Sequence, residues 1–501
     1  MNLYDMMKRQ KYVIYIVAVI VYIVTAVNSN GYYHPDEHYQ IIEFAGVKSG
    51  WNIGNDLTWE YDAQIRPALQ PSMASCLFKF FNLFGITSSF LMAMGLRLIT
   101  AGFSLICIIL FIRSFKNTLK PEFRIVFLLV SFFLWFIPAI NVRFSSETWA
   151  GSVLLLSIAL INRMESKKTM HFFIIGLLWG LCFEFRFQMG IILFSIFLWL
   201  IFIRKEALKN LLLLCLGGSV IVLGAFVLDS WFYGNWVFVP WNYFHINLIQ
   251  DVASQFGTSP WHFYIVQLVS KPTLLIGFLM FIALLFLLFF NHKHIVVWCV
   301  IPIIVIHSLI PHKELRFIFP IVNFIPLIMV LFFQEIYLLF KKRALFRIIV
   351  YPVGLIVLII NLGGLLMMSF KPGFDGNINI MQYLDKGQGR INLYVVGWSN
   401  PYILGEKVKG LTPRFYANNR VTVKELSDFS MLKRLGDNDL VIMRKIYQEQ
   451  VVMEREGFSI EKKSIPDWIA TLDRFYKVRP NYDYIFVLYS KQETKNALSP
   501  D

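Results

Sequence analysis

The chain has 501 residues, of which 57% are hydrophobic and only 16% are charged, against about 25% charged residues in ordinary soluble domains. This composition excludes a disordered chain, a collagen-like chain and a disulfide scaffold, and it argues strongly against a soluble protein. The formal net charge is +15, but most of the excess lies in short loops between apolar runs. That placement is typical of membrane topology and not of nucleic-acid binding.

Eleven apolar runs are long enough to cross a bilayer, singly or as paired half-spans, and their unalternated pattern predicts helices and not barrel strands. They are 12–28, 90–112, 124–140, 147–162, 171–186, 189–203, 211–229, 272–290, 295–310, 317–340 and 346–370. Lys and Arg precede the first run and follow the second, fourth, sixth, eighth and tenth, which predicts a cytoplasmic N-terminus. The large outer loops are then 29–89 and 230–271, and they lie on the periplasmic or lumenal side with the tail after 371.

The first outer loop contains two amphipathic stretches, 36–48 and 72–84, which we expect to be helices lying at the membrane interface. The loop opens with Asp36 and Glu37 directly after Pro35. Acidic residues that follow a first-turn proline are typical of helix capping. The alternative is a catalytic carboxylate at the membrane face, which could accept a proton from a hydroxyl group.

Further polar side chains lie at the outer ends of the predicted spans and in the outer loops. They suit contacts to a sugar or a lipid head group. Glu60 with Arg66 equally suits a loop salt bridge, and single aromatic residues are typical of an interfacial belt. These candidate substrate-binding residues are Trp59, Glu60, Arg66, Arg143, Glu147, Arg186, Asp229, Trp261 and His262.

A cluster of cationic residues opens the tenth predicted span. On a helix, His312 would lie four residues from Arg316 and Lys313 would lie three residues from it. Cations at a helix start on the outer face indicate a phosphate site, and the positive-inside rule does not explain them. The alternative is a structural pair of Glu314 with Arg316 or Lys313. Because ionisable residues at membrane depth indicate function by default, we favour the phosphate site.

The tail 371–501 is polar and predicts a small α/β domain outside the membrane. Its strand-like runs are 391–397, 440–443 and 484–489, and its helical stretches are 422–434 and 445–456. An Asp-x-Asp pattern occurs at 437–439 in this tail and not in the outer loops. The five cysteines are scattered, without a Cys-x-x-Cys pair, so we expect neither a metal site nor a disulfide framework.

Five elements, in order along the chain, together resemble glycosyltransferase family 22, the membrane mannosyltransferases of the GT-C class. The resemblance covers residues from 12 to about 340. Its motifs are HPDE followed by an aromatic residue and Gln at 34–40, TWE at 58–60 with Arg66, DSxxYG at 229–234, GTxPWHxY at 257–264 and HKExRFxxP at 312–320. The resemblance implies a GT-C bundle of about 11 transmembrane helices.

The resemblance also implies an activity: transfer of mannose, with inversion, from a dolichyl- or undecaprenyl-type phosphate donor on the non-cytoplasmic face. The acceptor is a lipid-linked glycan or glycolipid. Asp36 would be the general base, and Glu37 would assist or orient it. His312, Lys313 and Arg316 would hold the departing phosphate, and His34 would join the substrate contacts. A polyprenyl-phosphate leaving group requires no metal and no cofactor.

Two other classes remain open from the sequence. One is another GT-C transferase that uses a different polyprenyl-phosphate sugar, and the other is a flippase or transporter of lipid-linked sugars. A transporter would need polar groups near mid-membrane and internal repeats, whereas most ionisable residues here lie at helix ends and in loops. The compartment is the bacterial inner membrane or the endoplasmic reticulum. The outer segments contain no N-x-Ser/Thr sequon, which favours the bacterial membrane.

Overall fold

The fold is given by a computed structural model, which describes residues 3–52, 54, 57–163, 169–387, 389–403, 411–436, 438–447, 449–476 and 485–491. Residue 437 of the Asp-x-Asp pattern and residue 484 of a predicted strand lie outside these ranges. The chain folds as two compact units. The first, here called the helical unit, comprises Met1–Ala26, Glu60–Met73 and Arg97–Ser369, and the second, the mixed unit, comprises Val27–Trp59, Ala74–Leu96 and Phe370–Asp501.

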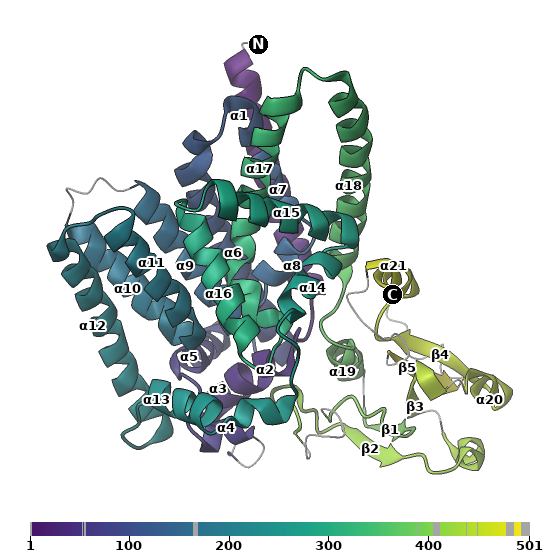
Figure 1. Cartoon of the computed structure of the whole chain (residues 1–501). Helices are drawn as coiled ribbons and strands as arrows, with labels where there is room; N and C mark the ends of the chain where they lie inside the picture. Colours follow the sequence, from purple (N-terminus) through teal and green to yellow (C-terminus); the bar gives the residue numbers. More distant parts are fainter. Residues whose placement is uncertain are drawn as a thin grey trace. The chain divides into compact units, whose positions relative to one another are not determined.

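The helical unit is a bundle whose helices correspond to the predicted apolar runs (Figure 1). Every one of the eleven runs is helical over most of its length. The elements that carry them are α1 (Leu3–Asn28), α6 (Ser89–Phe115), α7 (Arg124–Phe133), α8 (Ile137–Asn141), α9 (Ser146–Arg163), α10 (Met170–Phe185), α11 (Gly190–Phe202), α12 (Leu208–Tyr233), α15 (Leu274–Phe290), α16 (Ile295–Leu309), η7 (Leu315–Phe324), α17 (Ile325–Phe340) and α18 (Ala344–Phe370). Shorter helices connect them: α4 (Trp59–Asp62), α13 (Val239–Phe244) and α14 (Phe263–Ser270).

Five of the described helical segments are long and apolar enough to cross a membrane. They are Gln10–Asn28, Ser89–Thr118, Leu208–Tyr233, Leu315–Phe340 and Ile348–Phe370, and a sixth candidate is the pair α15 and α16, bent by 116°. This confirms an integral membrane protein. The predicted run 124–140 is broken between α7 and α8, where Asn361 Oδ1 accepts a hydrogen bond from Trp135 N–H (2.9 Å) and Asn361 Nδ2 donates to Phe133 O (2.7 Å). The break is tolerated because that side chain satisfies backbone groups that lipid cannot.

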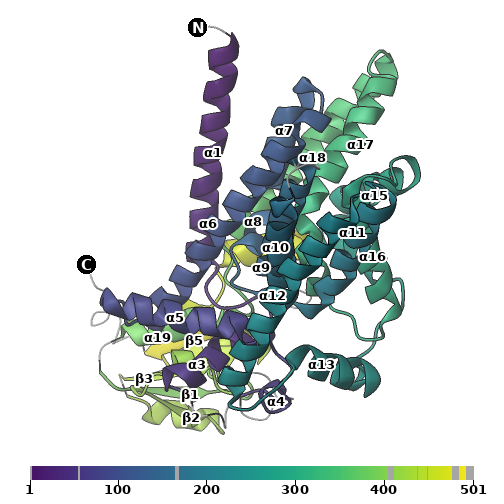
Figure 2. The ribbon, with the colours of Figure 1, turned by 90° about the vertical axis from the view of Figure 1, so that its left-hand side faces the viewer.

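Close glycine contacts fix two of the helix pairs that carry site residues. α10 and α12 lie side by side (Figure 2), and a Cβ on Gly176 would lie 2.1 Å from Leu214 O. α9 approaches η7 so closely that a Cβ on Gly151 would lie 2.7 Å from Pro320 Cα. Small residues allow such approaches between membrane helices. The first pair orients the helix ends at Arg186 and Asp229, and the second brings Glu147 towards Arg316.

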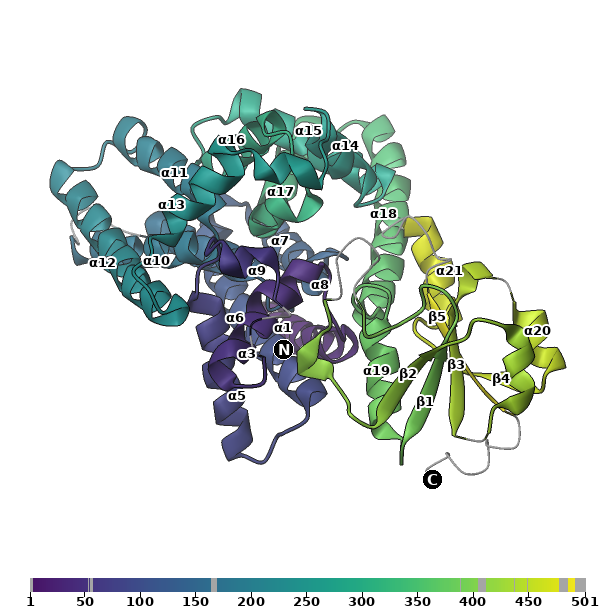
Figure 3. The ribbon, with the colours of Figure 1, turned by 90° about the horizontal axis from the view of Figure 1, so that it is seen from below.

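The mixed unit contains a five-stranded sheet in the order β2-β1-β3-β5-β4 (Figure 3). β1 pairs in parallel with β2 and β3, whereas β5 pairs antiparallel with β3 and β4. The strands are β1 (Ile391–Val395), β2 (Val421–Glu425), β3 (Asp439–Arg444), β4 (Phe458–Lys463) and β5 (Phe486–Lys491). α19 (Asn377–Lys386) packs Ile380 and Leu384 into one buried cluster of strand residues, and α20 (Gln450–Arg455) packs Met453 into another.

The tail contains both strands and helices, and one of its predicted elements was assigned wrongly. The stretch 422–434 is not a helix: its first part is strand β2, and 429–434 is a 3₁₀ turn. The alternation of Val421 and Val423 with polar residues explains the strand, because β-branched residues favour extended backbone. β4, α19 and α21 (Asp467–Tyr476) were not predicted.

The first outer loop is helical at both predicted stretches. The first forms α2 (Pro35–His38), the π-helical turn η1 (Tyr39–Glu43) and α3 (Phe44–Ser49), and the second forms α5 (Leu69–Leu83). Most of this loop belongs to the mixed unit, together with the C-terminal α/β residues.

Candidate active site

Residues 31–43, here called the carboxylate loop, place Asp36 in the first turn of α2. The ring of His34 caps this helix, because its Nδ1 accepts a hydrogen bond from Asp36 N–H at 3.3 Å. Pro35 occupies the first helical position, where a missing N–H costs nothing. The Asp36 carboxylate lies 3.4 Å from His34 Nδ1, and its side chain is 24% exposed. His34 and Asp36 are thus together at the N-terminal end of a helix, which is electrostatically suited to an ionised carboxylate.

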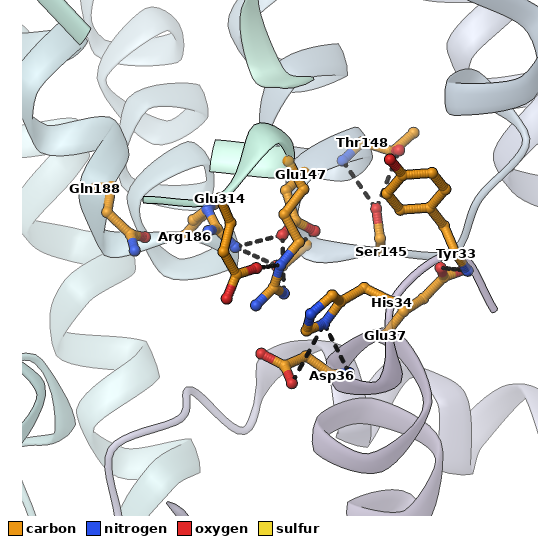
Figure 4. A network of polar contacts seen from close by, with 12 residues as sticks. Tyr33, His34, Asp36, Glu37, Ser145, Glu147, Thr148, Arg186, Gln188 and Glu314 are labelled. Carbon is orange, nitrogen blue, oxygen red and sulfur yellow. Dashed lines mark hydrogen bonds and ion pairs between the residues drawn. The ribbon is translucent and has the colours of Figure 1, made fainter. Parts of the chain in front are cut away.

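Glu37 has a different environment from its neighbour. Its Oε2 accepts a hydrogen bond from Tyr33 N–H at 2.9 Å (Figure 4). The side chain thus reaches back across the helix start, in the manner of a capping box. Helix capping and a catalytic carboxylate are therefore compatible for this acidic pair. Glu37 fixes the backbone at the start of α2, and the Asp36 side chain projects from it.

The helical unit contains a second group of charges, here called the cation cluster, built from Glu147, Arg186, Glu314 and Arg316 with His312 and Lys313. Arg186 Nη1 lies 2.7 Å from Glu147 Oε1 (Figure 4). Arg316 Nη1 lies 3.3 Å from the same oxygen. Arg316 Nε also pairs with Glu314. Glu147, Arg186 and Arg316 are buried. Glu147 and Arg186 were predicted as separate substrate contacts, and the structure pairs them with each other.

The structure of residues 312–316 differs from the helix that the spacing of His312, Lys313 and Arg316 predicts. His312 and Lys313 precede η7, which is a 3₁₀ helix over ten residues, and they do not share a helical face with Arg316. Pro320 lies inside η7 and has no N–H for a regular helical hydrogen bond. Long 3₁₀ stretches are uncommon and often mark functional segments.

Lys313 and His312 both bind the loop that carries the 257–264 motif. Lys313 Nζ donates to Ser259 O at 2.8 Å and also to the carbonyls of Ile310 and Pro311. Burial lowers the pKa of this lysine. His312 Nδ1 lies 2.8 Å from Gly257 O, and its Nε2 lies 3.1 Å from Glu314 Oε1. The hydrogen bond to Glu314 raises the pKa of the imidazole.

Two further predicted residues, Trp261 and His262, follow these contacts along the loop. Both are exposed at the start of α14, with ring centroids 5.6 Å apart. The neighbouring Tyr264 is buried, and its hydroxyl donates to Glu314 O at 3.2 Å. The loop is thus anchored to the cation cluster through its backbone and Tyr264, while Trp261 and His262 are available for contacts to lipid or substrate.

The remaining predicted contacts lie near α4 and the C-terminal end of α12. Arg66 Nη2 lies 3.5 Å from Glu60 Oε1, so the loop salt bridge is present. Asp229 is buried, and its Oδ1 accepts a hydrogen bond from Ala68 N–H at 2.7 Å, just before α5. Tyr233 OH donates to Arg66 O at 2.7 Å. Asp229 and Tyr233 of the DSxxYG motif therefore hold the backbone of residues 66–68 through hydrogen bonds.

Trp59 and Arg143 complete the predicted set. Trp59 begins α4 and is 37% exposed, and Arg143 is buried before α9. Sequence reasoning missed His38 and Glu43, a buried pair in the carboxylate loop with His38 Nε2 2.8 Å from Glu43 Oε1. The available signal was a glutamate inside the otherwise apolar stretch of 41–47.

Comparison with known proteins gives a family match over most of the chain. The model described as the Alg9-like mannosyltransferase family matches residues 12–388. The "GPI alpha-1,2-mannosyltransferase 3" of Xenopus laevis is 26% identical over 292 residues, which are 57% of this chain and 53% of the relative. The "GPI mannosyltransferase 3" of Yarrowia lipolytica is 25% identical over 320 residues, 62% of this chain and 60% of the relative. The matches thus cover just over half the length of these curated relatives.

Solved structures share the architecture at low sequence identity. The crystal structure of ArnT from Cupriavidus metallidurans bound to undecaprenyl phosphate has a TM-score of 0.50 and 12% identity, with 95% of this chain and 97% of that chain covered. The oligosaccharyltransferase of Archaeoglobus fulgidus also has a TM-score of 0.50, with 10% identity over 87% of this chain and 68% of that one. These likenesses concern the fold, and they confirm a polytopic GT-C membrane architecture.

Proposed function

The chain belongs to the Alg9-like mannosyltransferase family, glycosyltransferase family 22, and from this premise we propose that it is an inverting mannosyltransferase. Its donor is a polyprenyl-phosphate mannose, and its acceptor is a lipid-linked glycan or glycolipid on the non-cytoplasmic face of the membrane. The names of the curated relatives support a glycolipid acceptor. The bundle carries about eleven membrane spans, and the C-terminal α/β residues lie on the catalytic face.

The observation that carries the proposal is the composition of the cation cluster. Arg186 and Arg316 are balanced by the carboxylates of Glu147 and Glu314. Lys313, whose Nζ donates to backbone carbonyls, adds one positive charge next to Glu314 in the chain, before any charge on His312 is counted. Arg186 Nε has no hydrogen-bond partner among the described residues. A buried group with excess positive charge and a spare guanidinium donor suits a phosphate, because guanidinium binds phosphate oxygens with charge-assisted hydrogen bonds.

The members of the cluster have different tasks in this proposal. Arg186 and Arg316 stabilise the negative charge that develops on the leaving polyprenyl phosphate. Lys313 donates to backbone carbonyls, so it holds the 257–264 loop in place and adds its charge at longer range. His312, in its protonated form, adds a further positive charge beside Glu314.

Asp36 is the general base. The acceptor hydroxyl transfers its proton to the Asp36 carboxylate as its oxygen bonds to C1 of mannose. The bond between C1 and the phosphate oxygen breaks on the opposite side, and its electron pair leaves with the polyprenyl phosphate. A single displacement of this kind inverts the anomeric centre. Glu37 keeps the helix start in place through Tyr33 N–H, and His34, Trp59, Arg143, Trp261 and His262 contribute to substrate binding.

The test is transfer of labelled mannose from polyprenyl-phosphate mannose to a panel of lipid-linked glycan acceptors by purified protein in liposomes with EDTA. We expect transfer to persist in EDTA and to fall about 10²–10⁴-fold in Asp36→Asn, the range ascribed to general base catalysis. Asp62→Asn is the matched control, since Asp62 is an exposed aspartate elsewhere in the first outer loop, 29–89. A protein that neither binds nor turns over any polyprenyl-phosphate sugar would contradict the donor assignment, and vectorial movement of the donor without transfer would favour a flippase.

A further inference from the structure

The helical segment that carries Asp36 is short and irregular. α2, the π-helical turn η1 and α3 follow one another without a break over 35–49, and an isolated helix of about this length is at best marginally stable in water. The position of Asp36 therefore depends on tertiary contacts. These contacts lie within the mixed unit, and many of them come from residues more than 330 positions away in the chain.

The central contact is the buried pair of His38 and Glu43. His38 is 1% and Glu43 is 0% exposed, and they are five residues apart, the spacing that a π-helical turn brings together. Glu43 Oε1 accepts a hydrogen bond from Phe415 N–H at 3.1 Å, and Glu43 Oε2 accepts one from Asn52 Nδ2 at 2.9 Å. A buried carboxylate is costly unless donors surround it. One of these donors is supplied by the backbone of the C-terminal part of the chain.

Two tyrosines stack on the His38 ring. Tyr32 stacks on it with ring centroids 5.5 Å apart and an interplanar angle of 30°. Tyr416 stacks on it at 5.3 Å and 16°. The ring of Tyr416 also lies 5.1 Å from that of Phe90. The orientation of His38, which is the last residue of α2, is thus set by one ring of the carboxylate loop and one ring of the tail.

Further residues of the first outer loop also contact the tail segment. Tyr39 OH donates to Leu411 O at 3.4 Å. The Phe415 ring lies 4.9 Å from Phe78 and 5.4 Å from Trp51, centroid to centroid. The tail segment 411–416 therefore packs on the carboxylate loop and on the helices that follow it in the first outer loop.

A second set of tail residues holds the other end of the carboxylate loop. Gly373 N–H donates to Asn30 O at 2.8 Å, and Asn30 Nδ2 donates to Asn379 Oδ1 and Gln382 Oε1 at 3.2 and 3.0 Å. Gly31 has φ +90°, and a Cβ there would lie 3.1 Å from Ile378 Cγ1. The loop that begins at Gly31 and ends at Glu43 is thus fixed at both ends by the C-terminal part of the chain.

We propose that the tail segment 411–416 is a positioning element of the active site: through Tyr416 on His38 and Phe415 N–H on Glu43, it holds the helix that presents Asp36. This gives the C-terminal α/β residues a role in catalysis without contact to the reacting atoms. The catalytic part of the inference rests on the proposed function, because it requires Asp36 to be the base. The structural part, that 411–416 orders α2, stands without it.

The test compares Tyr416→Ala with Tyr416→Phe, which keeps the stacked ring, and with Trp398→Ala, which removes an exposed aromatic ring from the same unit. Hydrogen exchange of residues 35–43 is measured on full-length protein in detergent, alongside mannosyl transfer. We expect exchange in Tyr416→Ala to be about tenfold faster than in wild type. We expect kcat to fall about 100-fold, as for a misplaced catalytic group, with KM for both substrates within about twofold. Tyr416→Phe should stay much closer to wild type than Tyr416→Ala, and Trp398→Ala should match wild type in every measurement.

The two readouts separate this inference from the proposed function. Unchanged exchange of residues 35–43 in Tyr416→Ala overturns the positioning element, whatever the activity. Faster exchange with unchanged kcat shows that the order of α2 does not serve catalysis, and it overturns the positioning role. If wild type transfers no mannose, the proposed function fails, while the exchange measurement still decides whether 411–416 holds α2. Tyr416→Leu, which keeps apolar bulk without a ring, replaces the alanine variant if that variant does not purify as a monodisperse protein.

Discussion

The cation cluster and the carboxylate loop hold their charges in different ways. In the cation cluster, Arg186 and Arg316 are compensated by the carboxylates of Glu147 and Glu314, all carried at the ends of helices in the helical unit. In the carboxylate loop, Glu43 pairs with His38, and the loop is also held by backbone N–H groups, the Asn52 amide and stacked aromatic rings, some of them from the tail. The cluster is built mainly from paired side-chain charges that can be seen in the sequence, whereas the loop depends also on backbone N–H groups, whose partners the sequence does not reveal.

Because the cation cluster depends on paired side-chain charges, removing one of these charges should lower the free energy of unfolding more than the corresponding change in the carboxylate loop. Glu147→Gln leaves the Arg186 and Arg316 guanidinium groups buried beside a neutral amide. Breaking a buried ion pair by removing one partner costs about 3–5 kcal/mol, so we expect a loss of that size in the free energy of unfolding. The measurement is equilibrium unfolding in mixed micelles.

The matched control is Glu122→Gln, which makes the same change at an exposed glutamate. Surface substitutions usually stay within about 0.5 kcal/mol. A Glu147→Gln protein as stable as this control would mean that the cluster is not held together by its own charges, and the contrast with the carboxylate loop would be lost.

In the carboxylate loop, the corresponding change is Glu43→Gln. The amide oxygen can still accept a hydrogen bond, but the amide NH₂ would face Asn52 Nδ2 or Phe415 N–H, which are both donors. His38, unlike an arginine, can be neutral and still hydrogen-bond to the amide. The remaining cost is that of an unsatisfied buried donor, about 1–3 kcal/mol, so the loss should be smaller than for Glu147→Gln. Unfolding of the same preparations in mixed micelles gives the ranking directly, and an equal or larger loss for Glu43→Gln would reverse it.

A substitution at Gly31 tests how the N-terminal end of the carboxylate loop is held. Gly31→Ala forces an alanine into a left-handed conformation at φ +90° and places its Cβ 3.1 Å from Ile378. The left-handed region costs a residue with a Cβ about 1–2 kcal/mol, and we expect a loss of stability in that range. Gly102→Ala is the control, because a Cβ at this glycine within α6 meets nothing within 4 Å. Protection from proteolysis within residues 29–43 should fall only in Gly31→Ala.

These differences explain what could be predicted from the sequence. The eleven helical runs followed from hydrophobicity. Glu147, Arg186 and Arg316 could be singled out because charges are rare in lipid, and the structure pairs these side chains with one another. The pairing of His38 with Glu43 and their support by Phe415 and Tyr416 could not be predicted. That support depends on a backbone N–H and on ring stacking between segments more than 370 residues apart, and neither leaves a pattern in a single sequence. The prediction of a helix over 312–316 was wrong because spacing alone does not reveal that the helix begins only at Leu315 and is a 3₁₀ helix.

The smallest expected effect is a pH dependence at the edge of the cation cluster. The hydrogen bond to Glu314 raises the pKa of His312 above its unfolded value. The stabilisation is therefore complete below the unfolded pKa and is lost as the pH rises through the folded pKa. Because both side chains are partly exposed, the pair should contribute only about 0.2–1 kcal/mol. We expect the difference in unfolding midpoint between wild type and His312→Asn to shrink as the pH rises through that range. A difference that is constant, or that grows with pH, would mean that His312 acts as a neutral hydrogen-bonding partner of Gly257 O and Glu314, and that its charge adds nothing to the phosphate site.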